Sequence, residues 1–573
     1  MENKPQSAGV LREWMGSNSK ERSLLGASLF FLLVLAFCHR FSWMFAPFQQ
    51  DEYAHFIVVI QARHLVDMMA RITPNLQPIL DYLMLRCLWI PIFGSKELAL
   101  RLPSLIFSLA TQAFVFLAAY RFLQKRLESG ALAWFFALLV GLWAAGHDTE
   151  GHLAGVARHY AMVASLSAVW WFFYIAEEVD ISGRFFFFLS LIFANAHFFA
   201  LLLIAGAYGI ELCKFILRPE IRSASLRTIL RLFFFPLAIL ALTVAVNFSA
   251  FHMLVTDTPT AQPYGTGVPG LLNAAHSILD AWKSLYTEYV DWPFGVFTLG
   301  IALFLPFIPG VGKISRHRYW ASLLVFQPAF YFILRFRSSY YFGPRYHSVF
   351  YGFAFVSVLL LFCAAASLFL KYKGKPKALA VPALLAFGTI SLLLTLKGIS
   401  PGDAPEKLRW FLSGKHQNFS DNFLEQKYVQ ERRLPILWVH EACWESDNPF
   451  YYLGHNAAVL SDPNAYSKAY SYGFLVLDSA GCETSKEYAS AEVSRFFQIH
   501  GANTVVLREK AKSRESCVSM RPKLPAYLSL ELMPKEVTDR CVWVVSGAKK
   551  WADVKLAADQ LQFPYFPGFF PKE

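Results

Sequence analysis

Apolar segments long enough to cross a bilayer alternate with short polar connections from residue 23 to residue 396. The first of them, residues 23 to 46, follows a hydrophilic start that contains Lys4, Arg12 and Lys20, and it ends without a small-residue cleavage site. A hydrophobic stretch of this length is typical of a membrane span, whereas a signal peptide has a shorter apolar region. The pattern therefore predicts a retained first span with the amino terminus in the cytoplasm.

Threading the remaining apolar segments in alternation predicts eleven spans. After the first, they are 104–120, 131–146, 160–176, a pair of short segments on either side of 195–197, 232–251, 294–309, 320–334, 347–370 and 378–396. With this topology nearly every cluster of Lys and Arg falls on the cytoplasmic side, as the positive-inside rule requires. The segments 48–103, 147–159, 255–293 and 335–346 and the tail are then extracytoplasmic.

The segment 78–93 decides this topology. It is near the lower length limit for a span and contains Asp81 and Arg86, each of which costs about 2.5–3.5 kcal/mol at the centre of a spanning helix. Counting it as a span would move every later loop to the other side and invert the Lys/Arg bias. We therefore predict an interfacial helix in the first extracytoplasmic loop.

The character of the chain changes after residue 397. Apolar runs shorten to strand length at 436–439, 474–477, 504–507 and 541–545, and residues 489–500 have helical spacing. We predict a transmembrane domain over 1–397 and a small extracytoplasmic α/β domain over 398–573. The tail holds Cys443, Cys482, Cys517 and Cys541, which permit two disulfides in an oxidising compartment, and none has the C-x-x-C spacing of a zinc or redox site.

Composition agrees with a polytopic α-helical membrane protein, because 55% of the residues are hydrophobic and only 16% are charged. The net charge of +12 raises the alternative of nucleic-acid binding. The basic residues, however, lie in short loops between apolar segments, which is what topology alone produces. Nucleic acid is therefore not an expected partner.

An acidic pair, Asp51-Glu52, follows directly after the first span. Carboxylates beside lipid are costly unless they face water, a cation or a substrate. By itself the pair is as compatible with a solvated loop or a helix cap as with an active site.

Five short motifs together indicate one enzyme family. The run from Phe93 to Ser104 resembles the L-F-G-x-S-E-x-A-x-R-L-P-S segment of GT-C glycosyltransferases related to protein O-mannosyltransferases and lipid A aminoarabinose transferases. The other four motifs follow the family's order along the chain and its placement relative to the membrane spans. They are Asp51-Glu52, Gln77-Pro78-Ile79-Leu80, Ala157-Arg158-His159-Tyr160-Ala161 and Pro344-Arg345-Tyr346. Two features depart from the family pattern: Gln77 stands where a His is usual, and Asp51 is not part of a D-x-D motif.

The resemblance implies a GT-C fold and transfer of a sugar from a polyprenyl-phosphate donor. It implies Asp51 as the general base and Arg158 and Arg345 at the donor phosphate. For Glu52 three roles stay open: it assists Asp51, orients it, or caps a helix. An arginine at a helix end otherwise often only snorkels to the interface. Secondary candidates for substrate binding, which can equally be interfacial belt residues, are Tyr53, His55, His159, Tyr160, Tyr346 and His197.

Arg101 and the run 147–152 are interpreted as a structural residue and a polar loop. Arg101 is expected to pair within the first loop, with Glu97 or Asp81. The run from His147 to His152 has the composition of a metal site but no matching spacing, and we favour a polar active-site loop. A divalent metal is possible but not favoured, and no other cofactor is expected.

The resemblance further implies an inverting hexosyl- or pentosyltransferase, and by analogy with the family it would lie in a bacterial inner membrane. Its acceptor would be a lipid, protein or glycan on the extracytoplasmic face, and neither sugar nor acceptor is specified. Two alternatives stay open: a transporter or flippase of lipid-linked saccharides, and a non-catalytic scaffold. Transporters usually place ionisable groups at mid-membrane within repeated halves, whereas here they gather at one face.

Overall fold

The structure is a computed structural model. It describes residues 19–44, 79–93, 97–127, 129–147, 153–177, 179–217, 226–248, 316–330, 344–371, 436–440, 474–478, 503–513, 523–535 and 540–561, with single positions at 52, 59, 65, 68, 276, 498 and 517. The chain forms two compact units, one of residues 1–45 and 76–415 and the other of residues 46–75 and 416–573. The first is a helical bundle and the second contains a small sheet.

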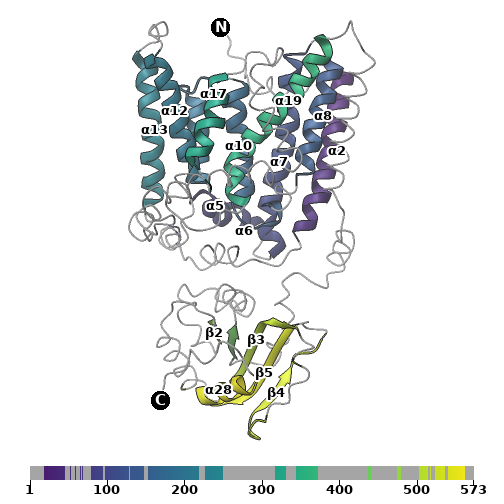
Figure 1. The fold of residues 1–573 in the computed structure, drawn as a ribbon, viewed down its shortest axis with the longest axis vertical. Coiled ribbons are helices and arrows are strands. Elements are labelled where there is room, and N and C mark those ends of the chain that lie inside the picture. The colour runs from purple at the N-terminus through teal and green to yellow at the C-terminus, as the bar shows by residue number, and fades with distance from the viewer. Residues whose placement is uncertain are drawn as a thin grey trace. The chain divides into compact units, whose positions relative to one another are not determined.

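Apolar helices that run side by side make up the bundle (Figure 1). Their bounds are α2 (Ser19–Trp43), α7 (Glu97–Gln124), α8 (Gly130–Ala145), α10 (Tyr160–Trp171) continued by the π-helical η3 (Phe172–Ala176), α11 (Arg184–Ala196), α12 (Phe199–Leu217), α13 (Leu226–Val246), α17 (Arg316–Ala321) continued by η7 (Ser322–Phe326), and α19 (Tyr351–Lys371) preceded by η8 (Pro344–Phe350). Among the described residues, four helices are long and apolar enough to cross a membrane: Ser19–Phe41, Ala99–Gln124, Leu226–Val246 and His347–Ser367. The helices coincide with predicted spans, which confirms the polytopic helical architecture. The predicted spans 294–309 and 378–396 lie outside the described residues.

The two ends of the bundle differ in charge. Basic residues stand in the first turn of α2, α13 and α17 and in the last turn of α7 and α12: Lys20, Arg227, Arg316, Arg121 and Lys214. These helix ends lie at one end of the bundle (Figure 1), which we call the basic end. The positive-inside rule predicts that this end faces the cytoplasm. At the opposite end, the segment predicted to be interfacial forms the short helices α5 (Ile79–Met84), η2 (Leu85–Trp89) and α6 (Ile90–Phe93), which lie beside the ends of the long helices (Figure 1).

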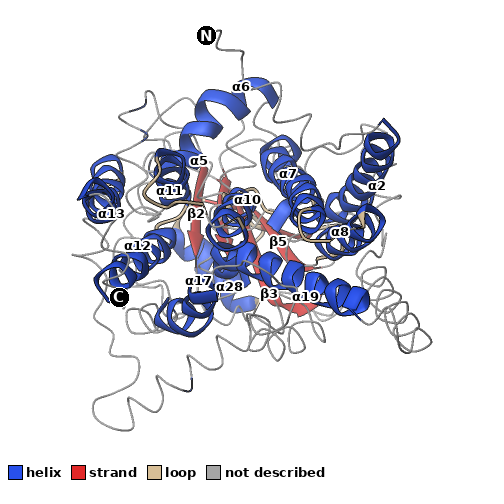
Figure 2. Ribbon diagram, turned by 90° about the horizontal axis from the view of Figure 1, so that it is seen from above, coloured by secondary structure: helices blue, strands red, loops and turns tan. Residues whose placement is uncertain are grey.

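Helices α10 and α19 form the centre of the bundle. Figure 2 shows α10 surrounded by other helices, and it packs against α7, α11 and α19. A Cβ on Gly352 of α19 would lie 2.0 Å from the Ser167 carbonyl oxygen of α10, so only glycine permits this approach. The Ser167 hydroxyl and the Trp171 indole N–H both donate to the Val349 carbonyl, at 2.8 and 2.9 Å. These contacts fix the start of α19 on the face of α10.

Helix α13, at one edge of the described bundle (Figure 2), has the opposite character. In α13, 17% of the residues in the apolar window are buried, against 94% in the window of α19. Phe233, Phe234 and Leu237 of α13 are among its exposed large apolar side chains. A helix that is apolar on every face and exposed on one is suited to contact with lipid.

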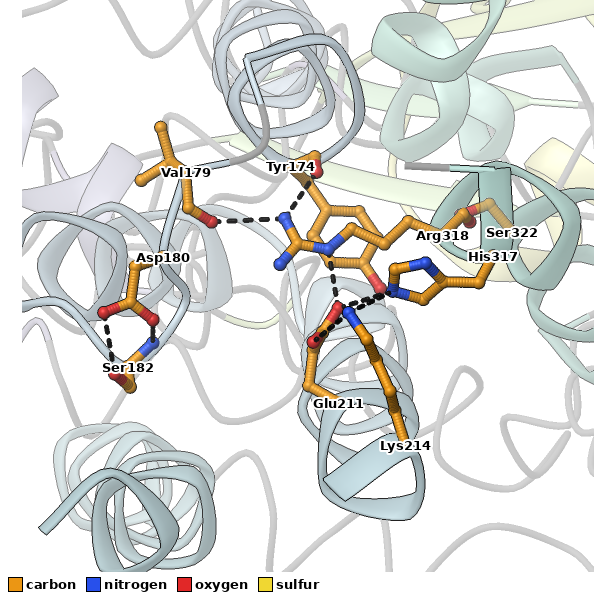
Figure 3. A network of polar contacts seen from close by, with 9 residues as sticks. All are labelled: Tyr174, Val179, Asp180, Ser182, Glu211, Lys214, His317, Arg318 and Ser322. Carbon is orange, nitrogen blue, oxygen red and sulfur yellow. Dashed lines mark hydrogen bonds and ion pairs between the residues drawn. The ribbon is translucent and has the colours of Figure 1, made fainter. Parts of the chain in front are cut away.

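At the basic end, a buried network of ion pairs and hydrogen bonds connects neighbouring helices (Figure 3). The Arg318 guanidinium of α17 donates through Nε to Glu211 Oε1 of α12 at 2.6 Å. Its Nη1 donates to the carbonyls of Tyr174 and Val179 at 2.8 and 3.1 Å. One side chain thus joins α17, α12 and the end of η3.

The second unit contains a mixed five-stranded sheet with the order β2-β1-β3-β5-β4. Its strands are β1 (Ile436–His440), β2 (Phe474–Asp478), β3 (Asn503–Ser513), β4 (Ser529–Leu532) and β5 (Arg540–Ala548). Strand β1 pairs in parallel with β2 and β3, whereas β5 is antiparallel to both β3 and β4. The four predicted strands are present, and with helix α28 (Trp551–Gln560) they form the predicted α/β domain. The predicted helix 489–500 lies outside the described residues apart from Gln498.

Strand β4 and helix α28 are elements that the sequence analysis did not predict. Asp553 stabilises the first turn of α28, because its Oδ2 accepts from the backbone N–H groups of Lys549 and Lys550 at 2.8 and 3.1 Å. A disulfide joins Cys517 to Cys541 of β5, with the Cα atoms 6.0 Å apart. Cys443 and Cys482 lie outside the described residues.

Candidate functional site

The loop that leads into α10 is fixed by its neighbours at the end of the bundle opposite the basic end. The Ser104 hydroxyl of α7 lies 2.8 Å from the Val156 carbonyl oxygen and 3.0 Å from that of Arg158. A Cβ on Gly155 would lie 2.5 Å from the Trp43 carbonyl oxygen, so the loop passes in contact with the end of α2. These contacts hold the backbone that carries the predicted Arg158-His159-Tyr160 motif.

Three rings and one cation converge where α10 begins. Ring centroids of His159 and Tyr160 are 4.5 Å apart, and that of His197 is 5.4 Å from His159 and 6.2 Å from Tyr160. The Arg158 Cζ lies 5.4 Å from the centre of the Tyr160 ring. His197 comes from the turn between α11 and α12, so packing of α11 on α10 completes the group. We call these four residues the Arg158 cluster.

Electrostatics within the Arg158 cluster favour a neutral imidazole. Burial, aided by the positive charge of Arg158, lowers the pKa of His197 to about 3. His197 Nδ1 accepts a hydrogen bond from the Phe199 backbone N–H at 3.2 Å, which assigns the ring proton to Nε2. The cluster therefore combines a half-buried guanidinium with a neutral N–H donor and aromatic faces, a combination that can bind a phosphate and a sugar ring.

The predicted acidic pair is described only in part. Asp51, Tyr53 and His55 lie outside the described residues. Glu52 is 1% exposed and belongs to the second compact unit. Burying a carboxylate is costly unless polar groups compensate it, so Glu52 is not a solvated loop residue.

The late Pro344-Arg345-Tyr346 motif begins η8, which packs against α10 and α19. This places its backbone beside the helix that starts at the Arg158 cluster. The side chains of Arg345 and Tyr346 lie outside the described part of the structure, so their role stays a prediction.

Several polar residues at this end were not singled out by the sequence analysis. Arg40 is fully buried in α2 and donates through Nη2 to the Ala144 carbonyl at 3.0 Å. A charged residue within an otherwise apolar segment was the available signal. Trp143 and Tyr351 stack with centroids 5.9 Å apart beside His147, and nothing local in the sequence pairs them.

Arg101 was expected to pair with Glu97 or Asp81, and that pairing stays a prediction, whereas the structure describes a contact of Arg101 with the end of α2. It is 1% exposed and donates through Nη1 to the Met44 carbonyl at 2.8 Å, which satisfies the end of α2. In the described ranges no group of three His, Cys, Asp or Glu residues could hold a metal ion. Of the predicted run 147–152, only His147 is described, and it is buried.

Comparisons with known proteins give a weak structural likeness. No protein-family model matches the chain, and no curated protein sequence matches it. The crystal structure of ArnT from Cupriavidus metallidurans bound to undecaprenyl phosphate is similar, with 12% identity, 91% of this chain and 98% of that chain covered, and a TM-score of 0.40. Its apo state has 11% identity, coverage of 91% and 97%, and a TM-score of 0.38. ArnT is a GT-C lipid A aminoarabinose transferase, one of the families whose motifs this sequence resembles. TM-scores of this size assign no activity to this chain.

Proposed function

We propose that this chain is an integral membrane glycosyltransferase of the GT-C type. It moves a sugar from a polyprenyl-phosphate donor to an acceptor on the extracytoplasmic face. The observation that carries the proposal is the Arg158 cluster, which gathers a cation, a neutral imidazole and aromatic rings at the end of the bundle opposite the basic end. The motif order of the sequence supplies the reaction class.

The leaving group of such a reaction is a phosphate that gains charge as its bond to the sugar breaks. Arg158 stays charged at any working pH and offers a planar fork of donors. His197 is held neutral by burial. It donates a hydrogen bond to the phosphate and does not compete with Asp51 for the proton of the acceptor hydroxyl. Donors fixed before reaction stabilise developing charge without reorganisation. Arg345 is proposed to assist from the neighbouring segment η8.

The acceptor hydroxyl needs a base. Asp51 takes its proton, and Glu52 orients or assists Asp51. The acceptor oxygen bonds to the anomeric carbon while the bond from that carbon to the phosphate oxygen breaks, and polyprenyl phosphate leaves. Attack in line with the leaving group inverts the anomeric centre. Tyr53, His55, His159, Tyr160 and Tyr346 are proposed to bind the two substrates.

We further propose that residues 1–397 form the catalytic domain in a bacterial inner membrane. The domain of residues 398–573 would lie on the extracytoplasmic side, where it caps the site or selects the lipid, protein or glycan acceptor. The disulfide between Cys517 and Cys541 supports an oxidising compartment for this domain.

The experiment compares intact masses of glycolipids and surface glycans between a deletion strain and strains that carry the wild-type chain, Asp51→Asn, Arg158→Ala or Arg158→Lys. We expect one sugar unit to be lost in the deletion, Asp51→Asn and Arg158→Ala strains and partly restored by Arg158→Lys. Purified wild type in nanodiscs should transfer the same sugar from extracted lipid donor. A wild type that moves the donor lipid across vesicles but makes no product would establish the flippase instead, and full activity of Asp51→Asn would remove Asp51 as the base.

A further inference from the structure

Helix α5 receives its N-terminal cap from a residue far away in the sequence. The first backbone N–H groups of a helix have no partner within the helix. The N–H of Ile79, the first residue of α5, donates to Asn247 Oδ1 at 2.8 Å, across a separation of 168 residues. Asn247 follows the end of α13, and both residues are buried. An asparagine of another helix thus performs the task that a local N-cap residue usually performs.

The amide of Asn247 is fixed by its other contacts. Its Nδ2 donates to the Thr243 carbonyl at 2.8 Å and to Asn195 Oδ1 at 3.1 Å. The Nδ2 of Asn195 donates in turn to Thr243 Oγ1 at 3.2 Å and to the Leu191 carbonyl at 2.9 Å. Each amide oxygen accepts and each amide nitrogen donates, so the network determines the orientation of both side chains.

This network connects two parts of the proposed site. Asn195 lies two positions before His197 of the Arg158 cluster, near the end of α11. Ile79 is the third residue of the Gln77-Pro78-Ile79-Leu80 motif and begins the helix that carries the buried Asp81. Helices α5 and α11 are in contact within the same compact unit. Asn247 therefore fixes the helix of the first-loop motif relative to the turn that supplies His197.

We propose that Asn247, together with Asn195, is a positioning residue of the transferase. It keeps helix α5 of the first extracytoplasmic loop in a fixed position relative to the Arg158 cluster, which is proposed to bind the donor phosphate. The inference rests on the proposed function. A displacement of about 1 Å of a group that positions the reactants can lower a rate about 100-fold. Removing the cap should therefore lower kcat and leave the binding of lipid phosphate intact.

The test uses the full chain in nanodiscs with Asn247→Leu, which keeps the volume but removes every hydrogen bond, and Asn247→Asp, which keeps an oxygen acceptor for Ile79. The control is Ser190→Ala on α11, where Ser190 accepts from the Trp170 indole N–H at 3.0 Å. That variant loses a buried hydrogen bond that does not reach α5. Three quantities are measured: hydrogen–deuterium exchange of a peptide spanning residues 79–84, the Kd for undecaprenyl phosphate, and kcat and KM for the transferred sugar.

We expect exchange over 79–84 to become about tenfold faster in Asn247→Leu, with the Kd for undecaprenyl phosphate within twofold of wild type and kcat lowered about 10- to 100-fold. Asn247→Asp should restore protection and part of kcat, and Ser190→Ala should alter neither. Unchanged exchange in Asn247→Leu would overturn the cap, and faster exchange with unchanged kcat would overturn the positioning role. If the wild type itself transfers no sugar, the proposed function fails, whereas the exchange experiment still decides whether Asn247 caps α5.

Discussion

Replacing Arg318 by Met tests whether the ion network at the basic end holds the bundle together. The side chains of Arg318 and Glu211 are 9% and 12% exposed, and their N···O distance is 2.6 Å. The substitution also removes the two hydrogen bonds to the carbonyls of Tyr174 and Val179. Removing one partner of a buried pair typically costs about 3–5 kcal/mol.

Two neighbours of Glu211 reduce this cost. His317 Nε2 and Lys214 Nζ lie 3.0 and 3.7 Å from its carboxylate oxygens, so the carboxylate keeps polar partners after Arg318 is lost. We therefore expect the lower end, about 3 kcal/mol. At about 2 °C for each kcal/mol in a large domain, the apparent Tm falls by about 6 °C.

The assay is the apparent Tm of the purified protein in detergent, from tryptophan fluorescence at a fixed scan rate, because such proteins often unfold irreversibly. The control is Lys125→Met at the same end, which breaks the exposed pair of Lys125 with Glu177, whose side chains are 45% and 18% exposed. Exposed pairs contribute about 1 kcal/mol or less, so this shift should stay below about 2 °C.

A double variant completes the test. Glu211→Met combined with Arg318→Met also removes the carboxylate that has lost its arginine partner, and the double variant should be more stable than Arg318→Met alone. A loss in Arg318→Met no larger than in Lys125→Met, or strictly additive losses in the double variant, would refute the coupling between α17 and α12.

Three further substitutions test other contacts. Gly352→Val should prevent close packing of α19 on α10, because even a Cβ would lie 2.0 Å from the Ser167 carbonyl oxygen; the yield of monodisperse protein should collapse, and normal yield would contradict that packing. In the folded protein the pKa of His197 is about 3, against an ordinary 6.5. The unfolded chain therefore takes up a proton below pH 6.5 that the folded protein does not, and the free energy of unfolding falls as the pH is lowered toward 3. The loss is on the order of 3 kcal/mol at pH 4. His197→Gln should therefore flatten the fall in apparent Tm between pH 7 and pH 4, and identical profiles would contradict burial of a neutral imidazole. Cys517→Ser opens a link across 24 residues to Cys541, worth about 3 kcal/mol in the chain-entropy account; limited proteolysis of the full chain should cut faster within residues 503–561, and an unchanged rate would contradict this.

Much of the bundle could be predicted from local patterns. Helices α7, α8, α10 and α13 lie where apolar length predicted spans, because a bilayer imposes one length on every crossing. The segment 78–93 was excluded as a span by its charges, and it forms short helices at the end of the bundle. Four strands of the tail followed from their apolar runs.

Other elements depended on contacts that no local pattern contains. Strand β4 has only four residues, too few for an alternation to be recognised. Helix α28 has a weak apolar pattern and depends on Asp553, whose Oδ1 also accepts from the Tyr527 hydroxyl at 2.9 Å. The position of Arg40 within an apolar run was visible in the sequence, but its partner, the Ala144 carbonyl of another helix, was not.

The sequence by itself predicted where the helices of the described bundle lie, since hydrophobic length acts segment by segment. The direction of the crossings stays a prediction from the placement of Lys and Arg. It also named Arg158, His159 and Tyr160 through a motif. Only the tertiary structure brought His197 to these residues and joined Asn247 to Ile79 across 168 positions. Such contacts arise when helices pack together. Each depends on a pair of residues whose separation in the chain follows no periodic rule, so no local pattern in the sequence predicts it.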